Sequence, residues 1–225
     1  MEHNIYIGNN NPAFTYTMAT HTLATTEAER DLGVTITADV KWHVHANNIA
    51  SKANSILGWM RSAFMCRDEN LWKKLYTTYI RPHLEFAAPA WNVYNRQDID
   101  RIERVQHRAT KVSHSLKQHS YPDRLKVLGL TTLETRRTRG DCIQQYKIQT
   151  GRDIVDWHAR PLMSGQALGH GPRLRREIVS NSQPRHHFFT NRIVNSWNPL
   201  PAAVASAPNV CEFKKEYDRV MNEAA

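Results

Sequence analysis

The strongest pattern in this sequence is a helical repeat of apolar and basic residues that begins at Asp98. Apolar residues recur at intervals of three and four, the spacing that places side chains on one face of an α-helix. They are Ile99, Ile102, Val105, Ala109, Val112 and Leu116. At about 100° from this face, the same intervals separate four basic residues, Arg101, Arg104, Arg108 and Lys111. The pattern predicts a helix that packs by one face and carries a basic ridge, made of these four residues, beside it.

Apolar stripes predict helices on both sides of this segment. One stripe begins at Ile49 and ends at Phe64, and Asp68 is a typical N-cap for the helix that follows. The apolar side of that second helix would consist of Leu71, Trp72, Leu75, Tyr76, Tyr79 and Ile80. Pro82 should kink or end it, because proline removes a backbone donor and clashes with the preceding turn.

Further helices are expected after residue 120. Residues 121–130 should form a short helix with Pro122 in its first turn and Gly129 as its C-cap, and a longer helix should run from about 132 to 149. Residues 188–201 and 206–218 indicate a short amphipathic helix, a proline stop, a loop and a last helix.

The first 40 residues favour strands and turns. Residues 5–8 and 14–18 are β-prone, and residues 32–37 should form another strand. Its apolar face would consist of Leu32, Val34 and Ile36. Residues 151–185 have few periodic apolar positions and several glycines and prolines, so we expect a long loop there.

Together these patterns predict a mainly α-helical fold with a small N-terminal antiparallel β element. Four segments are expected: strands and turns at 1–40, a helical domain at 41–150, the long loop at 151–185 and a C-terminal helical segment at 186–225.

The charge of the chain is concentrated in its second part. The net charge is +9, but residues 1–100 contain 9 Lys/Arg and 10 Asp/Glu, whereas residues 101–225 contain 21 and 11. Such one-sided charge attracts polyanions, because neutralised phosphates release condensed counterions. Besides the ridge, the basic clusters are Arg136, Arg137 and Arg139, and Arg173, Arg175 and Arg176. Nucleic acid is the expected partner, and a membrane is not, since no basic helix carries a broad exposed apolar face.

Several strings of the chain resemble, in order, the C-terminal region of reverse transcriptases from non-LTR (LINE-type) retrotransposons of the jockey and chicken-repeat kind. The resemblance covers roughly residues 8–220. The string IGNNNP, residues 7–12, and residues 29–36 resemble the stretch that leaves the palm, and residues 51–64, 75–91 and 98–111 resemble the thumb helices. Residues 121–141 and the string FFTNRIVNSWNPLP, residues 188–201, resemble the region beyond the thumb. The resemblance implies a helical thumb-like bundle at 41–150, a palm-edge remnant at 1–40, and a thumb that grips the template–primer duplex by its backbone.

The family's catalytic residues have no counterpart here. Such polymerases hold two metal ions with palm carboxylates that include an adjacent aspartate pair, and this chain has no Asp-Asp dipeptide. The palm, the fingers and the endonuclease domain would precede the point at which the sequence begins. We therefore expect no catalytic residue and no cofactor in this chain, with Mg²⁺ belonging to the missing palm.

Other metal and stacking sites find little support in the sequence. Asp98 and Asp100 would point about 200° apart on a helix, and neither His43-x-His45 nor the pair at 186–187 has partners at zinc-finger spacing. Among the tryptophans, Trp157 in the expected loop is the candidate for stacking on a base.

Two other functions stay open. The chain could be a retained helical scaffold or protein-interaction module derived from such an element, or a polymerase subunit whose palm another chain supplies. Other parts of the parent polymerase are therefore possible partners. Because the N-terminus has neither a signal-peptide layout nor a long apolar run, we expect an intracellular protein, nuclear or cytoplasmic, that is not secreted.

Overall fold

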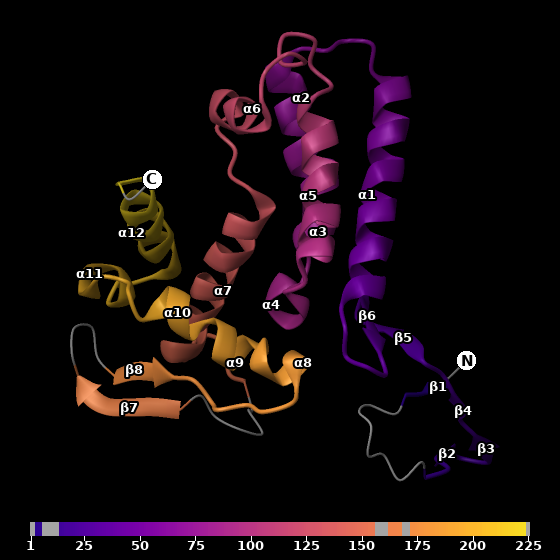
Figure 1. The fold of residues 1–225 in the computed structure, drawn as a ribbon, viewed down its shortest axis with the longest axis vertical. Coiled ribbons are helices and arrows are strands. Elements are labelled where there is room, and N and C mark those ends of the chain that lie inside the picture. The colour runs from indigo at the N-terminus through magenta and orange to yellow at the C-terminus, as the bar shows by residue number, and fades with distance from the viewer. Residues whose placement is uncertain (1–2, 6–13, 156–161, 168–171, 224–225) are drawn as a thin grey trace. The chain divides into compact units, whose positions relative to one another are not determined.

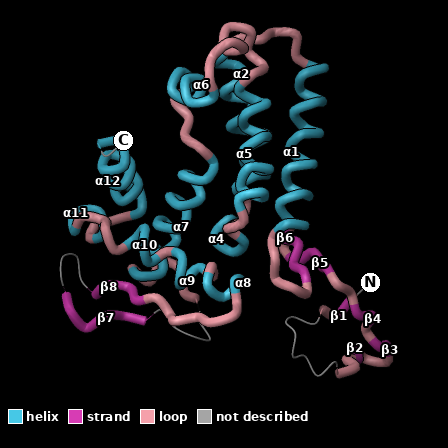
Figure 2. Tube along the Cα trace, viewed as in Figure 1, coloured by secondary structure: helices cyan, strands magenta, loops and turns pink. Residues whose placement is uncertain are grey.

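The structure is a computed structural model that describes residues 3–5, 14–155, 162–167 and 172–223 (Figure 1). The fold is mainly helical with a small antiparallel hairpin near the N-terminus, which confirms the predicted fold class (Figure 2). The chain divides into two compact units. The first consists of Met1–Ala87 and Trp91–Glu134, and the second of Ala88–Ala90 and Thr135–Ala225.

This boundary divides the predicted helical domain at 41–150. Helix α7 (Leu133–Gln149) was expected to belong with the preceding helices, but from Thr135 onward it belongs to the second unit. The reason is that Cys142 and Tyr146 of α7 belong to the core cluster formed by the C-terminal helices.

Two long helices form the framework of the first unit. Helices α1 (His43–Ala63) and α5 (Arg96–Thr110) lie side by side and run in the same direction (Figure 1). Their buried faces are built from Ala46, Ala50, Ala53, Leu57 and Met60 of α1 and from Ile102, Val105 and Ala109 of α5. The small alanines of α1 permit a close helix–helix contact.

The shorter helices of the first unit begin and end at the expected signals. Asp68 caps α2 (Glu69–Leu75), since its carboxylate accepts from the backbone N–H of Leu71 at 2.8 Å. Helix α6 (Tyr121–Leu128) ends at Gly129, whose φ of +57° is the left-handed conformation that favours glycine. Both caps confirm the sequence predictions.

Pro82 was predicted to kink or end its helix, and the helix does not end there. Helix α2 continues into a π-helical turn, η1 (Tyr76–Ile80), and then into α3 (Arg81–Glu85), followed by α4 (Ala88–Trp91). Pro82 lies in the first turn of α3, directly after the π turn. The wider π turn changes the register, and Tyr79, expected on the apolar face, is 58% exposed.

The N-terminal part of the first unit consists of short strand pairs and one hairpin. The hairpin pairs β5 (Ala28–Asp31) with β6 (Val34–Thr37) in antiparallel register. The shorter strands are β1 (His3–Asn4), β2 (Thr17–Met18), β3 (His21–Thr22) and β4 (Ala24–Thr25). Residues 6–13, including most of the strand expected at 5–8, lie outside the described part of the chain.

Leu32 was expected on the apolar face of a strand, but it lies in the hairpin turn and is 87% exposed. Leu32 and Gly33 have φ values of +45° and +88°, and a two-residue turn with both φ values positive matches the twist of the flanking strands. Behind the turn, β6 is fixed to α1 because the N–H of Thr35 donates to Nδ1 of His45 at 3.1 Å.

A buried amide joins three segments of the first unit. Gln106 of α5 is fully buried, and its Oε1 accepts from the hydroxyl of Tyr76 at 2.6 Å. Its Nε2 donates to the hydroxyl of Tyr121 at 2.9 Å and to the carbonyl of Thr131 at 3.0 Å. A buried amide with its bonds made specifies one arrangement of α5, η1 and α6, because an unmade bond there is costly.

Glu103, one turn before Gln106, extends this network. Its carboxylate accepts from the Tyr121 hydroxyl and from the backbone N–H of Leu133 at 3.0 Å, which is the first residue of α7. Burial and the hydrogen bond to Glu103 raise the pKa of Tyr121, so its hydroxyl stays protonated as a donor.

The second unit surrounds an aromatic core. Tyr146 of α7 stacks on Phe213 of α12 (Val210–Glu223) with 4.5 Å between ring centroids, and Trp197 of α10 (Val194–Trp197) completes the stack. The other elements are α8 (Gln183–His186), α9 (Phe189–Arg192) and α11 (Ala202–Ala205). The prediction of a long loop at 151–185 is wrong in part, because two strands, β7 (Leu162–Ala167) and β8 (Pro172–Arg175), pair within this segment.

Residues 188–201 contain two short helices, and polar side chains of this segment make hydrogen bonds to neighbouring segments. The side chain of Asn198 bonds both the N–H and the carbonyl of Leu174, at 3.0 and 2.9 Å, and so fixes β8 to α10. Arg192 makes two bonds to the buried carboxylate of Asp141, at 2.8 and 2.9 Å. Among the aromatic residues of this string, Phe188 is 47% exposed, whereas Phe189 and Trp197 are buried.

We expect acid to destabilise the fold through His45. Burial, together with the positive charge of Arg30, lowers the pKa of His45 to about 4. The folded state then binds fewer protons than the unfolded state, so its stabilising contribution is full above the unfolded pKa of about 6.5 and is lost toward pH 4. Between about pH 7 and pH 5 the free energy of unfolding should fall by about 2 kcal/mol more in the parent chain than in His45→Gln.

Urea unfolding in a phosphate-free buffer measures this difference. The exposed His114 provides the control, and His114→Gln should show the same pH dependence as the parent chain. If the free energy of unfolding fell equally in His45→Gln and in the parent chain, the role of His45 would be contradicted.

Candidate nucleic-acid interface

The basic ridge lies on the solvent side of α5. Arg104, Arg108 and Lys111 are exposed, and all four ridge residues occur within 11 consecutive positions of the chain. At a rise of about 1.5 Å per residue the ridge is about 15 Å long. The neighbouring face of α5 is held inward by Ile102, Val105 and Gln106, each fully buried.

The ridge residues differ in the hydrogen bonds and ion pairs that they make within the protein. The Nε of Arg104 donates to the carbonyl of Asp100 at 3.2 Å, and Nη1 of Arg108 donates to the amide oxygen of Asn54 at 3.0 Å. Neither bond neutralises the guanidinium charge. In the described part of the chain, no carboxylate forms an ion pair with Arg104, Arg108 or Lys111. Arg101 differs, since it pairs with the buried carboxylate of Asp98 and its side chain is 33% exposed.

A stripe of small residues on α1, three polar and one glycine, accompanies the ridge. It consists of Asn47, Ser51, Asn54 and Gly58, which recur at intervals of four, three and four residues. Because α1 and α5 run in the same direction, Asn47 lies near Arg101 and Asn54 near Arg108. An added Cβ at Gly58 would meet no atom within 4 Å, so the far end of this α1 stripe is open.

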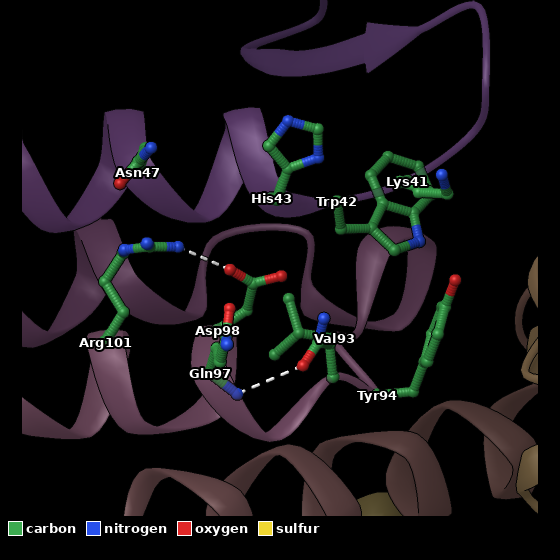
Figure 3. A pocket seen from close by; sticks show the side chains of 10 residues that line it. Lys41, Trp42, His43, Asn47, Val93, Tyr94, Gln97, Asp98 and Arg101 are labelled. Atoms are coloured by element: carbon green, nitrogen blue, oxygen red, sulfur yellow. Dashed lines mark hydrogen bonds and ion pairs between the residues drawn. The ribbon is translucent and has the colours of Figure 1, made fainter.

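A cleft of about 240 Å³ lies at the N-terminal ends of α1 and α5 (Figure 3). Its walls include Lys41, Trp42 and His43 on one side and Tyr94 and Arg101 on the other. Arg101 therefore lines the cleft and also begins the ridge. The arrangement combines cationic, amide and aromatic groups, the types that contact phosphates and sugars.

The cluster on α7 does not form part of such a surface. Arg137 is 3% exposed, so it is too buried to contact a nucleic-acid backbone. Arg139 makes two bonds to Asp218 of α12, at 2.6 and 2.7 Å, and Arg136 is half-buried. The prediction that these three arginines bind nucleic acid is therefore wrong for Arg137 and unsupported for Arg139. The reason is that Arg137 is on the buried side of α7, and Arg139 is bound to Asp218 of α12.

The third cluster is exposed on and beside β8. Arg173 and Arg175 are exposed while Leu174 between them is 4% exposed, the alternation expected of a strand with one covered face. Arg176 follows and is exposed too. This cluster belongs to the second unit, whereas the ridge belongs to the first.

Sequence reasoning found the ridge but missed the α1 stripe and the cleft. The stripe had a detectable signal, since its small polar residues share the helical spacing of the ridge. The cleft had no such signal. It brings together Lys41, Tyr94 and Arg101, and their proximity depends on how α1 and α5 pair. Trp157, the stacking candidate, lies outside the described residues.

The carboxylates near the ridge do not fit a magnesium pair. Asp98 is bound to Arg101, and Asp100 forms an ion pair with Arg96 at 3.0 Å. No group of three or more His, Cys, Asp or Glu residues in the described ranges could hold a metal ion. None of the described helices combines the length and apolar character that crossing a membrane requires.

Comparisons of the chain with protein-family models, with curated proteins and with solved structures return no match.

We expect Arg139 to contribute to stability and not to binding. Arg139→Gln should lower the free energy of unfolding by roughly 1 kcal/mol, because it removes a partly exposed two-point ion pair. Its affinity for an RNA–DNA duplex should equal that of the parent chain. A double-mutant cycle with Asp218→Asn, read by urea unfolding, measures the pair. Weaker duplex binding by a fully folded Arg139→Gln would contradict this assignment.

Proposed function

We propose that this chain is the thumb-containing C-terminal part of a non-LTR retrotransposon reverse transcriptase. It binds template–primer nucleic acid by the backbone, along the ridge of α5 and the stripe of α1. The observation that carries the proposal is the set of exposed cations Arg104, Arg108 and Lys111, whose charges no described carboxylate neutralises. The ordered resemblance of residues 29–201 to that family supports the same reading.

The dimensions of the ridge suit a phosphate backbone. A ridge of about 15 Å spans about four base-pair steps of about 3.4 Å along one strand. Arginine and lysine donate to phosphate oxygens without regard to sequence, and the amides of Asn47 and Asn54 can donate to phosphates or sugars beside them. Binding of this kind positions a duplex and reads no base.

The proposal assigns no polymerase chemistry to this chain. The palm that would hold Mg²⁺ and the catalytic aspartates is absent from the sequence, so an active enzyme would need that palm from elsewhere. Other parts of the parent polymerase, and RNA or DNA, are the proposed partners.

A helical scaffold or protein-interaction module is the second candidate. The observation that favours it is a set of exposed aromatic side chains in the first unit: Trp59 is 67% exposed, and Tyr79 and Phe86 are each 58% exposed. Large exposed aromatics are typical of protein–protein contacts. A chain that binds no nucleic acid would be explained best in this way.

Salt dependence tests the proposed function. The affinity of the full chain for an RNA–DNA duplex should fall steeply as salt is raised from about 50 to 200 mM, independently of sequence. In Arg104→Gln/Arg108→Gln, the slope of log affinity against log salt should decrease by about two, because two phosphate contacts are lost. Filter binding measures both slopes, and circular dichroism should show unchanged helicity.

The matched control removes two exposed charges elsewhere, at Lys126 on α6 and Arg219 on α12. Lys126→Gln/Arg219→Gln changes net charge equally and should keep the parent slope. Equal slopes in both double variants would place the binding surface away from α5. No binding of any nucleic acid at low salt would refute the proposed function and favour the scaffold.

A further inference from the structure

A second basic site lies on the other side of α1. There, a cavity of about 250 Å³ lies between α1, the β5–β6 hairpin and α3. Its walls carry four nitrogen-containing side chains, from Arg30 of β5, His45 and Lys52 of α1, and His83 of α3. Positions 45, 49 and 52 are almost opposite the α1 stripe around the helix, so this pocket is separate from the ridge.

No carboxylate lines this pocket among the described residues. Its other lining residues are Gly33, Ile49 and Phe86, and within the described ranges neither Arg30, Lys52 nor His83 forms an ion pair. The two cations act on the two histidines instead, and disfavour their protonation. After burial, the second cause that lowers the pKa of His45 is Arg30, and the second cause that lowers the pKa of His83 is Lys52. Like charges that face one cavity create a strong positive potential, which an anion would relieve.

His45, which lines this cavity, has a buried donor. Its Nδ1 accepts from the N–H of Thr35 at 3.1 Å, so the ring proton of the neutral imidazole lies on Nε2. This Nε2 is buried and has no hydrogen-bond partner among the described residues. The ring is held in place because it packs edge-on against Trp91, with centroids 4.6 Å apart. A buried donor without a partner is uncommon in folded proteins and indicates a missing acceptor.

The hairpin turn and Phe86 complete the wall. Gly33 has a φ of +88°, and a Cβ added there would lie 3.2 Å from the Phe86 ring. A side chain at position 33 would crowd this ring and would also strain the left-handed backbone there. Phe86 is 58% exposed, so the pocket has an apolar rim beside its basic wall.

We propose that this pocket binds a phosphate group, held by the side chains of Arg30 and Lys52 with His45 and His83 as hydrogen-bond donors. Arginine and lysine are the usual phosphate ligands, and a tetrahedral oxyanion has enough acceptors to satisfy all four side chains. The group could belong to a small phosphorylated molecule or to the end of a nucleic-acid strand. The site stands independently of the function proposed for the ridge.

A phosphate titration of the full chain at constant ionic strength tests the site. Inorganic phosphate should shift the imidazole ¹H–¹⁵N signals of His45 and His83 with a single saturable curve, and chloride should not. In Arg30→Gln/Lys52→Gln the apparent Kd should rise at least tenfold. Both altered side chains are exposed, so this variant should keep the parent unfolding midpoint.

Arg104→Gln/Arg108→Gln is the matched control, because it removes two charges from the ridge and none from the pocket. It should bind phosphate as the parent chain does while losing duplex affinity, which separates this proposal from the proposed function. The site is refuted if phosphate causes no saturable shift, or if the pocket variant and the ridge variant bind phosphate equally.

A competition experiment identifies the source of the phosphate. If the end of a strand is the ligand, a 5′-phosphorylated oligonucleotide should displace phosphate at least tenfold better than the same strand without that group. Displacement by glycerol phosphate, with no difference between the two strands, would assign a small phosphorylated molecule. Displacement by the unphosphorylated strand alone would overturn a terminal-phosphate site.

Discussion

The buried amide of Gln106 is the interaction on which the first unit depends. Through its hydrogen bonds with Tyr76, Tyr121 and Thr131, it determines which side of α5 faces the interior. Glu103 favours the same orientation of α5, because its carboxylate accepts a hydrogen bond from the first N–H of α7. Since side chains on a helix keep fixed angular relations, the ridge must then face solvent. The position of the ridge is therefore a consequence of buried polar bonding as well as of apolar packing.

Much of the fold was predictable because local signals and tertiary packing agree. The apolar stripes of α1 and α5, the caps at Asp68 and Gly129 and the course of α7 all follow from spacing and cap chemistry. The failures have physical causes. A π turn rotated Tyr79 outward, and a turn with two positive φ values moved Leu32 out of its strand. The β7–β8 pair is hard to predict because β8 has one apolar side chain, Leu174 between two arginines, and β7 (Leu162–Ala167) has no regular alternation in the sequence.

The candidate site was predictable only in part, because basic residues look alike in sequence whatever surrounds them. The ridge could be predicted because its basic residues recur at the same helical intervals as the apolar residues beside them. Arg137 and Arg139 belong to a cluster that looks equally basic in the sequence. Arg137 is buried, however, and Arg139 is paired with Asp218. Similarly, Arg124 is 1% exposed and donates to the carbonyl of His119 at 2.6 Å. In the string at 188–201, Arg192 and Asn198 hold the second unit together and so mark structure more than activity. Net charge therefore overstates the surface available to a polyanion.

The claim that the ridge of α5 is the nucleic-acid surface is tested most directly by arginine side-chain NMR. The Nε–Hε signals report each guanidinium separately, so they can be followed while an RNA–DNA duplex is added to the full chain. The account predicts that the signals of Arg104 and Arg108 shift, while that of Arg139, whose Nε is bonded to Asp218 at 2.6 Å, does not. Duplex binding that shifts Arg139 and leaves Arg104 and Arg108 unchanged would contradict it.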